Sequence, residues 1–243
     1  LDHMDTYGGD PRRLEDAFLT FLHQLPFWGL AVLCADDPVL MRLRASVSKP
    51  VLTYGVHESA DLRAVDLVQE GLAMRFVARR AGQADLPVTV NLPGLHNVQN
   101  ALAAIAIGRE VGVPDAAIAR ALQRFEGIGR RTQVLGQVAL AGGGITLVDD
   151  YGHHPREIAA TLAAVRGAYP GRRVVTVFQP HRYTRTRDLF EDFAHVLAQC
   201  EALVLLEVYA AGEAPLAGAD GRALDRAIRA RGTVEPVFVP ETA

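Results

Sequence analysis

Hydrophobic residues follow two patterns along this chain. Short continuous apolar runs predict strands, and apolar residues three or four positions apart predict helices. Near the start, residues 28–34 and 51–54 are short apolar runs typical of strands. Residues 11–25 and 38–47 have apolar side chains three or four positions apart, as on one face of a helix, and Asp10 is a suitable N-cap for the first. This order predicts a parallel sheet covered by helices.

The next stretch predicts three strands of an antiparallel patch. Residues 62–69, 73–79 and 87–91 are strand-like, with Gly71 and Gly82 near the turns. We therefore expect a mixed arrangement in the first half of the chain.

The clearest helical pattern starts at Pro93-Gly94 and ends at Gly112. Its first turn carries three polar side chains: His96, Asn97 and Asn100. The N-terminus of a helix leaves N–H groups unpaired and favours anions or polar heterocycles. The alternative is that Asn97 merely caps the helix, which would explain one amide and leave the other two residues unexplained.

Beyond a segment rich in glycine and arginine, residues 127–131, strand and helix patterns alternate again. We place a domain boundary there, giving domains 1–129 and 130–243. The arginine pair is either solvated charge or a phosphate contact at a hinge. Four apolar runs predict strands: residues 145–148, 174–178, 202–206 and 237–239.

Asp149 to Pro155 hold the densest chemistry of the chain: two carboxylates, a tyrosine, two imidazoles and a proline suited to the first turn of a helix. The apolar run before them predicts a buried strand. Open α/β sheets bind ligands at the carboxyl ends of their strands. We expect a functional site here, the alternative being an ordinary polar turn.

A second polar segment, residues 179–187, follows the next strand and carries four side chains that are or can be cationic. Its position and charge are typical of an anion-binding loop, the alternative being solvated charge. A third strand ends at Glu207 and Tyr209. In one parallel sheet these three ends would converge on a single rim.

Composition narrows the classes of function. The chain has 243 residues, half of them apolar, and a net charge of −3, so we expect neither nucleic acid nor an anionic membrane as a partner. No apolar run approaches the roughly 20 residues that span a bilayer. Cys34 and Cys200 are expected to be buried free thiols in a reducing, cytoplasmic compartment. The single lysine, Lys49, has no glycine before it, so the chain contains no P-loop.

Taken together, five motifs resemble the Mur ligases, and the resemblance runs the length of the chain. Each motif is weak alone, but their order is that of the family. They are Asp2 to Tyr7, Gly94 to Ala101, Gly129 to Arg131, Asp149 to Pro155 and Phe178 to Arg187.

The resemblance implies an α/β fold in two parts: a truncated central ATPase-type domain with a mixed sheet, then a truncated Rossmann-like C-terminal domain. It also implies that the family's N-terminal UDP-sugar domain, the P-loop and the extreme C-terminus lie outside this chain. We therefore expect the 243 residues alone to be inactive.

The double-histidine motif and the Gln-Pro-His-Arg segment point to the L-alanine-adding activity of peptidoglycan precursor synthesis. The implied reaction uses ATP and Mg²⁺ to phosphorylate the carboxylate of UDP-N-acetylmuramate. The L-alanine amine then attacks the acyl phosphate. Charge around the transferring phosphoryl group must be neutralised.

Carried over residue by residue, the resemblance gives His3 a role as a ligand of Mg²⁺, although imidazole is a poor match for that ion. Arg131 would reach the nucleotide phosphates, and Asp150 would hold the ribose. The ATP base and neighbouring groups would be held by three residues of one helix: His96, Asn97 and Asn100. Thr132-Gln133 departs from the aromatic and acidic pair that is usual there.

Further residues would line the L-alanine and acyl-phosphate side. Tyr151, His153, His181 and Arg182 are expected to bind substrate, and His154, with His181 and Arg182, to take part in catalysis.

Two other functions compete with this hypothesis. One is a non-catalytic α/β module that binds an anion or a nucleotide. The other is a metal-dependent hydrolase built on His3, His153 and His154, which is disfavoured because adjacent histidines on a turn usually point apart.

Overall fold

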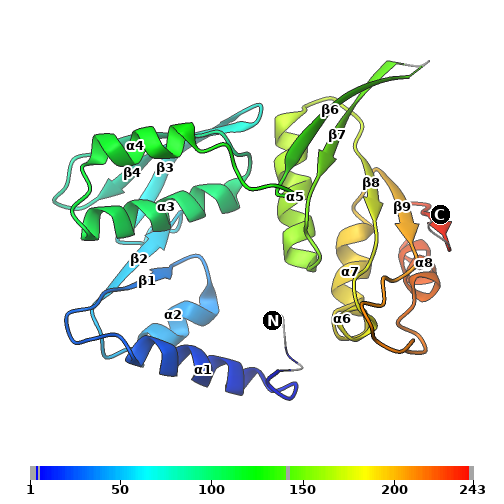
Figure 1. Cartoon of the computed structure of the whole chain (residues 1–243), viewed down its shortest axis with the longest axis horizontal. Coiled ribbons are helices and arrows are strands. Elements are labelled where there is room, and N and C mark those ends of the chain that lie inside the picture. The colour runs from blue at the N-terminus through cyan, green and yellow to red at the C-terminus, as the bar shows by residue number, and fades with distance from the viewer. Residues whose placement is uncertain (1–3, 5, 141–142, 241–243) are drawn as a thin grey trace. The chain divides into compact units, whose positions relative to one another are not determined.

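The computed structural model describes residues 4, 6–140 and 143–240, so His3 and its predicted metal role lie outside the described residues. The chain divides into two compact units, residues 1–128 and 129–243, which are described separately (Figure 1). None of the described helices is long and apolar enough to cross a membrane.

The first unit is built on one five-stranded mixed sheet in the order β1-β2-β3-β4-β5. β1, β2 and β3 are parallel, and β3, β4 and β5 are antiparallel, so the predicted parallel and antiparallel parts belong to the same sheet. Its strands are β1 (Ala31–Cys34), β2 (Val51–Gly55), β3 (Leu62–Glu70), β4 (Ala73–Arg80) and β5 (Leu86–Val90).

The helices of this unit are α1 (Pro11–His23), α2 (Pro38–Arg44), α3 (Leu95–Glu110) and α4 (Asp115–Arg124). The helix α3 packs its fully buried Leu102 and Ile105 into the core of the sheet, beside Leu62 and Phe76. The predicted cap of α1 is confirmed, because the Asp10 side chain accepts a hydrogen bond from the Arg12 amide.

A carboxylate locks the loop after β1 to the end of β2. Asp36 accepts hydrogen bonds from the amides of Val56 and His57, at 3.0 and 2.9 Å, and from the Gln99 side chain at 2.7 Å. Gly55 leaves room for it, since a Cβ there would lie 2.6 Å from the carboxylate. Burial alone would raise the pKa of Asp36, but these donors outweigh burial and hold it below its ordinary value.

Asp36→Asn should therefore destabilise the first unit in a pH-dependent way. The folded pKa is depressed, so the contribution of the charged group is fully present above an unfolded pKa of about 4 and is lost as the pH falls through the folded pKa. An asparagine has one acceptor for three donors. We expect a loss of roughly 1–2 kcal/mol at pH 7, discounted for partial exposure, and a smaller one at pH 3.

Denaturant unfolding of the 243-residue chain, followed by hydrogen exchange in peptides of this unit, measures the difference. Asp188→Asn is the matched control, because Asp188 forms an exposed ion pair with Arg187 in the other unit. An equal effect of Asp36→Asn at both pH values would contradict the assignment.

The second unit contains a parallel three-stranded sheet and a separate antiparallel ribbon. The sheet has the order β10-β9-β8 and comprises β8 (Val175–Phe178), β9 (Ala202–Leu206) and β10 (Val237–Val239). The ribbon pairs β6 (Gln133–Leu140) with β7 (Gly143–Asp149). Its helices are α5 (Pro155–Ala168), α6 (Tyr183–Asp188), α7 (Phe190–Leu197) and α8 (Gly221–Ala230). Fully buried side chains of α7, α8 and β9 make the core, among them Phe193, Leu197, Leu205, Leu224 and Ile228.

Two predictions for this unit are wrong. The run 145–148 is not a buried strand of the parallel sheet, because β7 pairs only with β6 among the described strands (Figure 1). Ile145 and Leu147 are exposed. A short apolar run has the same appearance in a buried strand and in a ribbon, because periodicity does not specify the partner. Residues 183–187 are helical, in α6, where the sequence predicted a loop.

Candidate functional site

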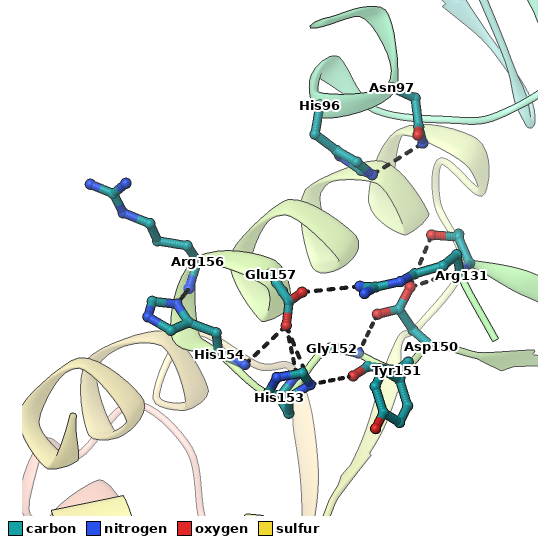
Figure 2. Close-up of polar contacts among 11 residues, drawn as sticks. His96, Asn97, Arg131, Asp150, Tyr151, Gly152, His153, His154, Arg156 and Glu157 are labelled. Atoms are coloured by element: carbon teal, nitrogen blue, oxygen red, sulfur yellow. Dashed lines mark hydrogen bonds and ion pairs between the residues drawn. The ribbon is translucent and has the colours of Figure 1, made fainter. Parts of the chain in front are cut away.

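In the polar first turn of α3, the N-cap residue is a glycine and not the asparagine. Gly94 is the N-cap, with φ of 93°, a conformation that favours glycine. The Asn97 side chain donates to the Pro93 carbonyl at 2.8 Å and contacts His96 Nε2 at 3.1 Å (Figure 2). Asn97 therefore does not act as the N-cap, and its bond to Pro93 gives it a different local structural role. Asn97 instead positions the imidazole of His96, while Asn100 is exposed.

In the second unit, Asp150 organises the turn that follows β7. Its carboxylate accepts from the Thr132 amide at 2.7 Å, the Thr132 hydroxyl at 3.2 Å and the Gly152 amide at 2.8 Å. Arg130 and Thr132 both have positive φ, 60° and 47°, which costs energy in residues other than glycine. The hydrogen bonds to Asp150 offset that strain at Thr132. They therefore fix the backbone next to Arg131, and they give the unusual Thr132 a structural role.

Two arginines lie against one tyrosine in this turn. The guanidinium carbons of Arg130 and Arg131 are 4.9 and 5.7 Å from the centroid of the Tyr151 ring, within cation–π range. The Tyr151 amide also donates to the Arg130 carbonyl at 2.7 Å. Tyr151 is 48% exposed, so the ring and both cations are accessible from solvent.

Glu157, which is not among the predicted site residues, connects Arg131 to the backbone of His153 and His154. It accepts from the His153 amide at 3.0 Å, the His154 amide at 3.2 Å and Arg131 at 3.0 Å (Figure 2). Burial would raise its pKa, but the hydrogen bonds from His153, Arg131 and His154 outweigh that effect and lower it. The signal in the sequence was a capping box, in which the N-cap and the third helical residue bond reciprocally.

The two adjacent histidines have different structural partners. His154 is the N-cap of α5, and its ring accepts from the Arg156 amide at 3.2 Å. His153 Nδ1 lies 3.0 Å from the Tyr151 carbonyl oxygen. Within the part of the chain that the structure describes, no group of three or more His, Cys, Asp or Glu side chains could hold a metal ion. The hydrolase hypothesis also requires His3, which lies outside the described residues.

The segment after β8 is tied to the segment after β9. His181 forms a parallel bridge with Tyr209, and the two rings are stacked with centroids 5.5 Å apart. Arg182 follows with φ of 71° and forms the N-cap of α6. The Arg185 guanidinium lies 3.3 Å from both Nδ1 and the carbonyl oxygen of His181. A cation donating to Nδ1 requires a lone pair on that nitrogen and so favours the neutral ring.

The two loops meet at their histidines. The ring centroids of His153 and His181 are 6.4 Å apart, and Tyr209 adjoins His181 on its other side. The ends of β7, β8 and β9 therefore converge as expected, although β7 belongs to a different sheet. Of the predicted residues, the second unit brings together Arg131, Asp150, Tyr151, His153, His154, His181 and Arg182. The first unit carries His96, Asn97 and Asn100.

His181 should titrate below the ordinary histidine value. Burial lowers its pKa, and the positive charges of Arg185 and Arg182 lower it further. Arg185→Ala removes a repelling cation, so the midpoint should rise. Histidine C–H chemical shifts in the 243-residue chain, followed from pH 4.5 to 8.5, measure both values. An unchanged midpoint in the variant would show that Arg185 does not act on His181.

In each unit, taken by itself, polar side chains gather at a helix start or at strand ends, the positions at which α/β proteins commonly bind nucleotides and anions. The Mur ligase middle domain model matches residues 1–108, and the model of the Mur ligase glutamate ligase domain matches residues 130–243. The chain belongs to the Mur ligase family.

Individual relatives show which members of the family the chain is similar to. The chain is 60% identical to the UDP-N-acetylmuramate–L-alanine ligase of Thiobacillus denitrificans over 243 residues, which is all of this chain and 52% of that protein. It spans about half the length of the curated relatives it matches. The solved UDP-N-acetylmuramate–alanine ligase of Thermotoga maritima shares 26% identity, with a TM-score of 0.74 over 99% of this chain and 49% of that one. A MurF ligase of Thermotoga maritima, solved in complex with ADP, is 16% identical, with a TM-score of 0.64 over 81% of this chain and 44% of that one, and shows the fold alone.

Proposed function

We propose that this chain supplies part of the active site of an ATP-dependent ligase that joins L-alanine to UDP-N-acetylmuramate. The observation that carries the proposal is the convergence of arginine, histidine and carboxylate side chains at the strand ends of the second unit. The 60% identity to the Thiobacillus denitrificans ligase supports the choice of substrates. The reaction belongs to peptidoglycan precursor synthesis, which would place the protein in the cytoplasm.

The chemistry fits a two-step reaction. The γ-phosphoryl group of ATP passes to the substrate carboxylate, which gives an acyl phosphate and ADP. The amine of L-alanine then attacks the acyl carbon, the amide forms, and inorganic phosphate leaves. Both steps place negative charge near the reacting centre, and fixed cations stabilise it.

The predicted residues that the structure describes have roles in this scheme that fit their surroundings. Asp150 would accept a hydrogen bond from a ribose hydroxyl, because a carboxylate has about four acceptor positions and three are in use here. Arg131, next to Asp150, would contact nucleotide phosphate. In the first unit, a polar first turn suits the adenine base and its neighbours: His96, Asn97 and Asn100.

On the other side of the second unit's site, the neutral ring of His181 suits proton transfer from the incoming amine. Arg182 suits a carboxylate or a phosphate. Tyr151 and His153 line the same face. His154 would act through the cap of α5, which holds the preceding turn. Mg²⁺ would accompany the phosphates of ATP, and we assign none of the described residues to it.

The test is a chimaeric enzyme, called the graft below. In the Thiobacillus denitrificans ligase, the matching segment is replaced by these 243 residues, and phosphate release is measured with UDP-N-acetylmuramate, L-alanine and ATP. Activity within about tenfold of the parent supports the proposal. A folded graft without activity would refute it and favour the non-catalytic binding module. Because these residues include no P-loop, the chain by itself should bind Mg-ATP weakly and release phosphate only at background.

A further inference from the structure

A short segment after β9 braces the cationic segment after β8. The Tyr209 amide donates to the Pro180 carbonyl at 2.8 Å, and the Arg182 amide donates to the Tyr209 carbonyl at 2.9 Å. The chain then turns sharply, because Ala211 and Gly212 both have positive φ, 50° and 89°. This turn brings the next residue, Glu213, back toward the start of α6.

The Glu213 carboxylate is fixed by the first residues of α6. Its Oε1 accepts from the Thr184 hydroxyl at 2.6 Å, and its Oε2 accepts from the Thr184 amide at 3.0 Å. Burial would raise the pKa of Glu213, but the bonds from Thr184, the amide of Tyr183 and the charge of Arg182 outweigh burial and lower it. The Glu213 carboxylate is therefore a negative charge that hydrogen bonds hold in place next to the arginines.

The need for such an anion follows from the local charges and backbone. Residues 182–187 contain three arginines, and like charges this close repel one another. Arg182 is also in the left-handed region, which costs about 1 kcal/mol or more unless neighbouring contacts compensate. Contacts from Tyr209 and Glu213 hold the backbone on both sides of Arg182.

We propose that Glu213 is a positioning residue: by bonding Thr184 and facing Arg182, it fixes the geometry in which His181, Arg182 and Arg185 meet an anionic substrate group. The role of that substrate group rests on the proposed function. The positioning itself does not, because it is a property of this chain alone.

The first test uses the 243-residue chain. Glu213→Gln keeps the size of the side chain but removes the charge and one acceptor. The Thr184 amide should then exchange with solvent at least about tenfold faster. The negative charge of Glu213 raises the pKa of His181, opposing the effects of burial, Arg185, Arg182 and His153, so its removal should lower the His181 midpoint.

Two further variants keep the test decisive. Thr184→Val removes only the hydroxyl partner and should speed the same amide exchange, while Thr184→Ser should restore it. Glu191→Gln is the control, since Glu191 is an exposed residue paired with Arg231. If Glu213→Gln does not fold, Thr184→Val decides the question. Unchanged exchange and an unchanged His181 midpoint would overturn the proposal.

A kinetic measurement separates positioning from a purely structural effect. In the active graft, Glu213→Gln should raise the KM for L-alanine about tenfold and change kcat less than threefold. A tenfold loss in kcat with an unchanged KM for L-alanine would overturn the positioning role. If the graft carrying native Glu213 is itself inactive, the proposed function fails, and the exchange and titration data still decide the role of Glu213.

Discussion

Replacing Asp150 with alanine is expected to lower ligase activity of the graft at least about 100-fold, the largest functional effect that the structure predicts. The substitution removes a carboxylate that accepts three hydrogen bonds from Thr132 and Gly152. Thr132 then loses the contacts that offset its positive φ. The backbone beside Arg131 should relax, so that the proposed ribose contact and the neighbouring cation are both affected.

Asp149→Ala is the matched control. Asp149 is the adjacent carboxylate. Among the described residues its side chain accepts a hydrogen bond only from Arg130, with 3.2 Å between Nε and Oδ2, and both side chains are partly exposed. Its removal should change activity less than about fivefold. Steady-state kinetics with varied ATP would show the Asp150 effect mainly in kcat/KM for ATP. Activity of Asp150→Ala within threefold of the native graft would exclude Asp150 from the site.

Leu224→Ala should produce the largest loss of stability, about 2–5 kcal/mol. Leu224 lies on α8, is completely buried and packs in the core of the second unit. Truncation leaves a cavity among side chains from α7 and β9 that cannot collapse fully. Denaturant unfolding of the chain, followed by hydrogen exchange in peptides from this unit, measures the effect.

The control for Leu224 is Leu135→Ala in the same unit. Leu135 is 58% exposed on β6, so little apolar surface is returned to water, and the change should stay within about 0.5 kcal/mol. Peptides of the first unit should be protected equally in both variants, because its core is separate. A loss below 1 kcal/mol for Leu224→Ala would contradict the packing.

Only some residues of the candidate site could be predicted from the sequence. Asp150, His153 and His181 were singled out because polar side chains followed predicted strands, and the structure brings their turns into contact. Glu157 and Glu213 are not among the predicted site residues. Glu157 completes a local capping box with the amides of His153 and His154, but its ion pair with Arg131 spans 26 residues. The partner of Glu213, Thr184, is 29 residues away.

The sequence by itself determined the local structure: the apolar spacing of the helices, the cap at Asp10, the proline start of α5, and where the strands of the first unit and β8, β9 and β10 lie along the chain. These depend on a few neighbouring residues, whose spacing and capping chemistry act over one or two turns. Only the tertiary structure decided that β7 pairs with β6 outside the parallel sheet, that residues 183–188 form a helix, and that Glu213 holds that helix. The physical reason is that strand pairing and buried hydrogen bonds are chosen among distant partners, and an apolar run or a single carboxylate carries no record of which partner it will meet.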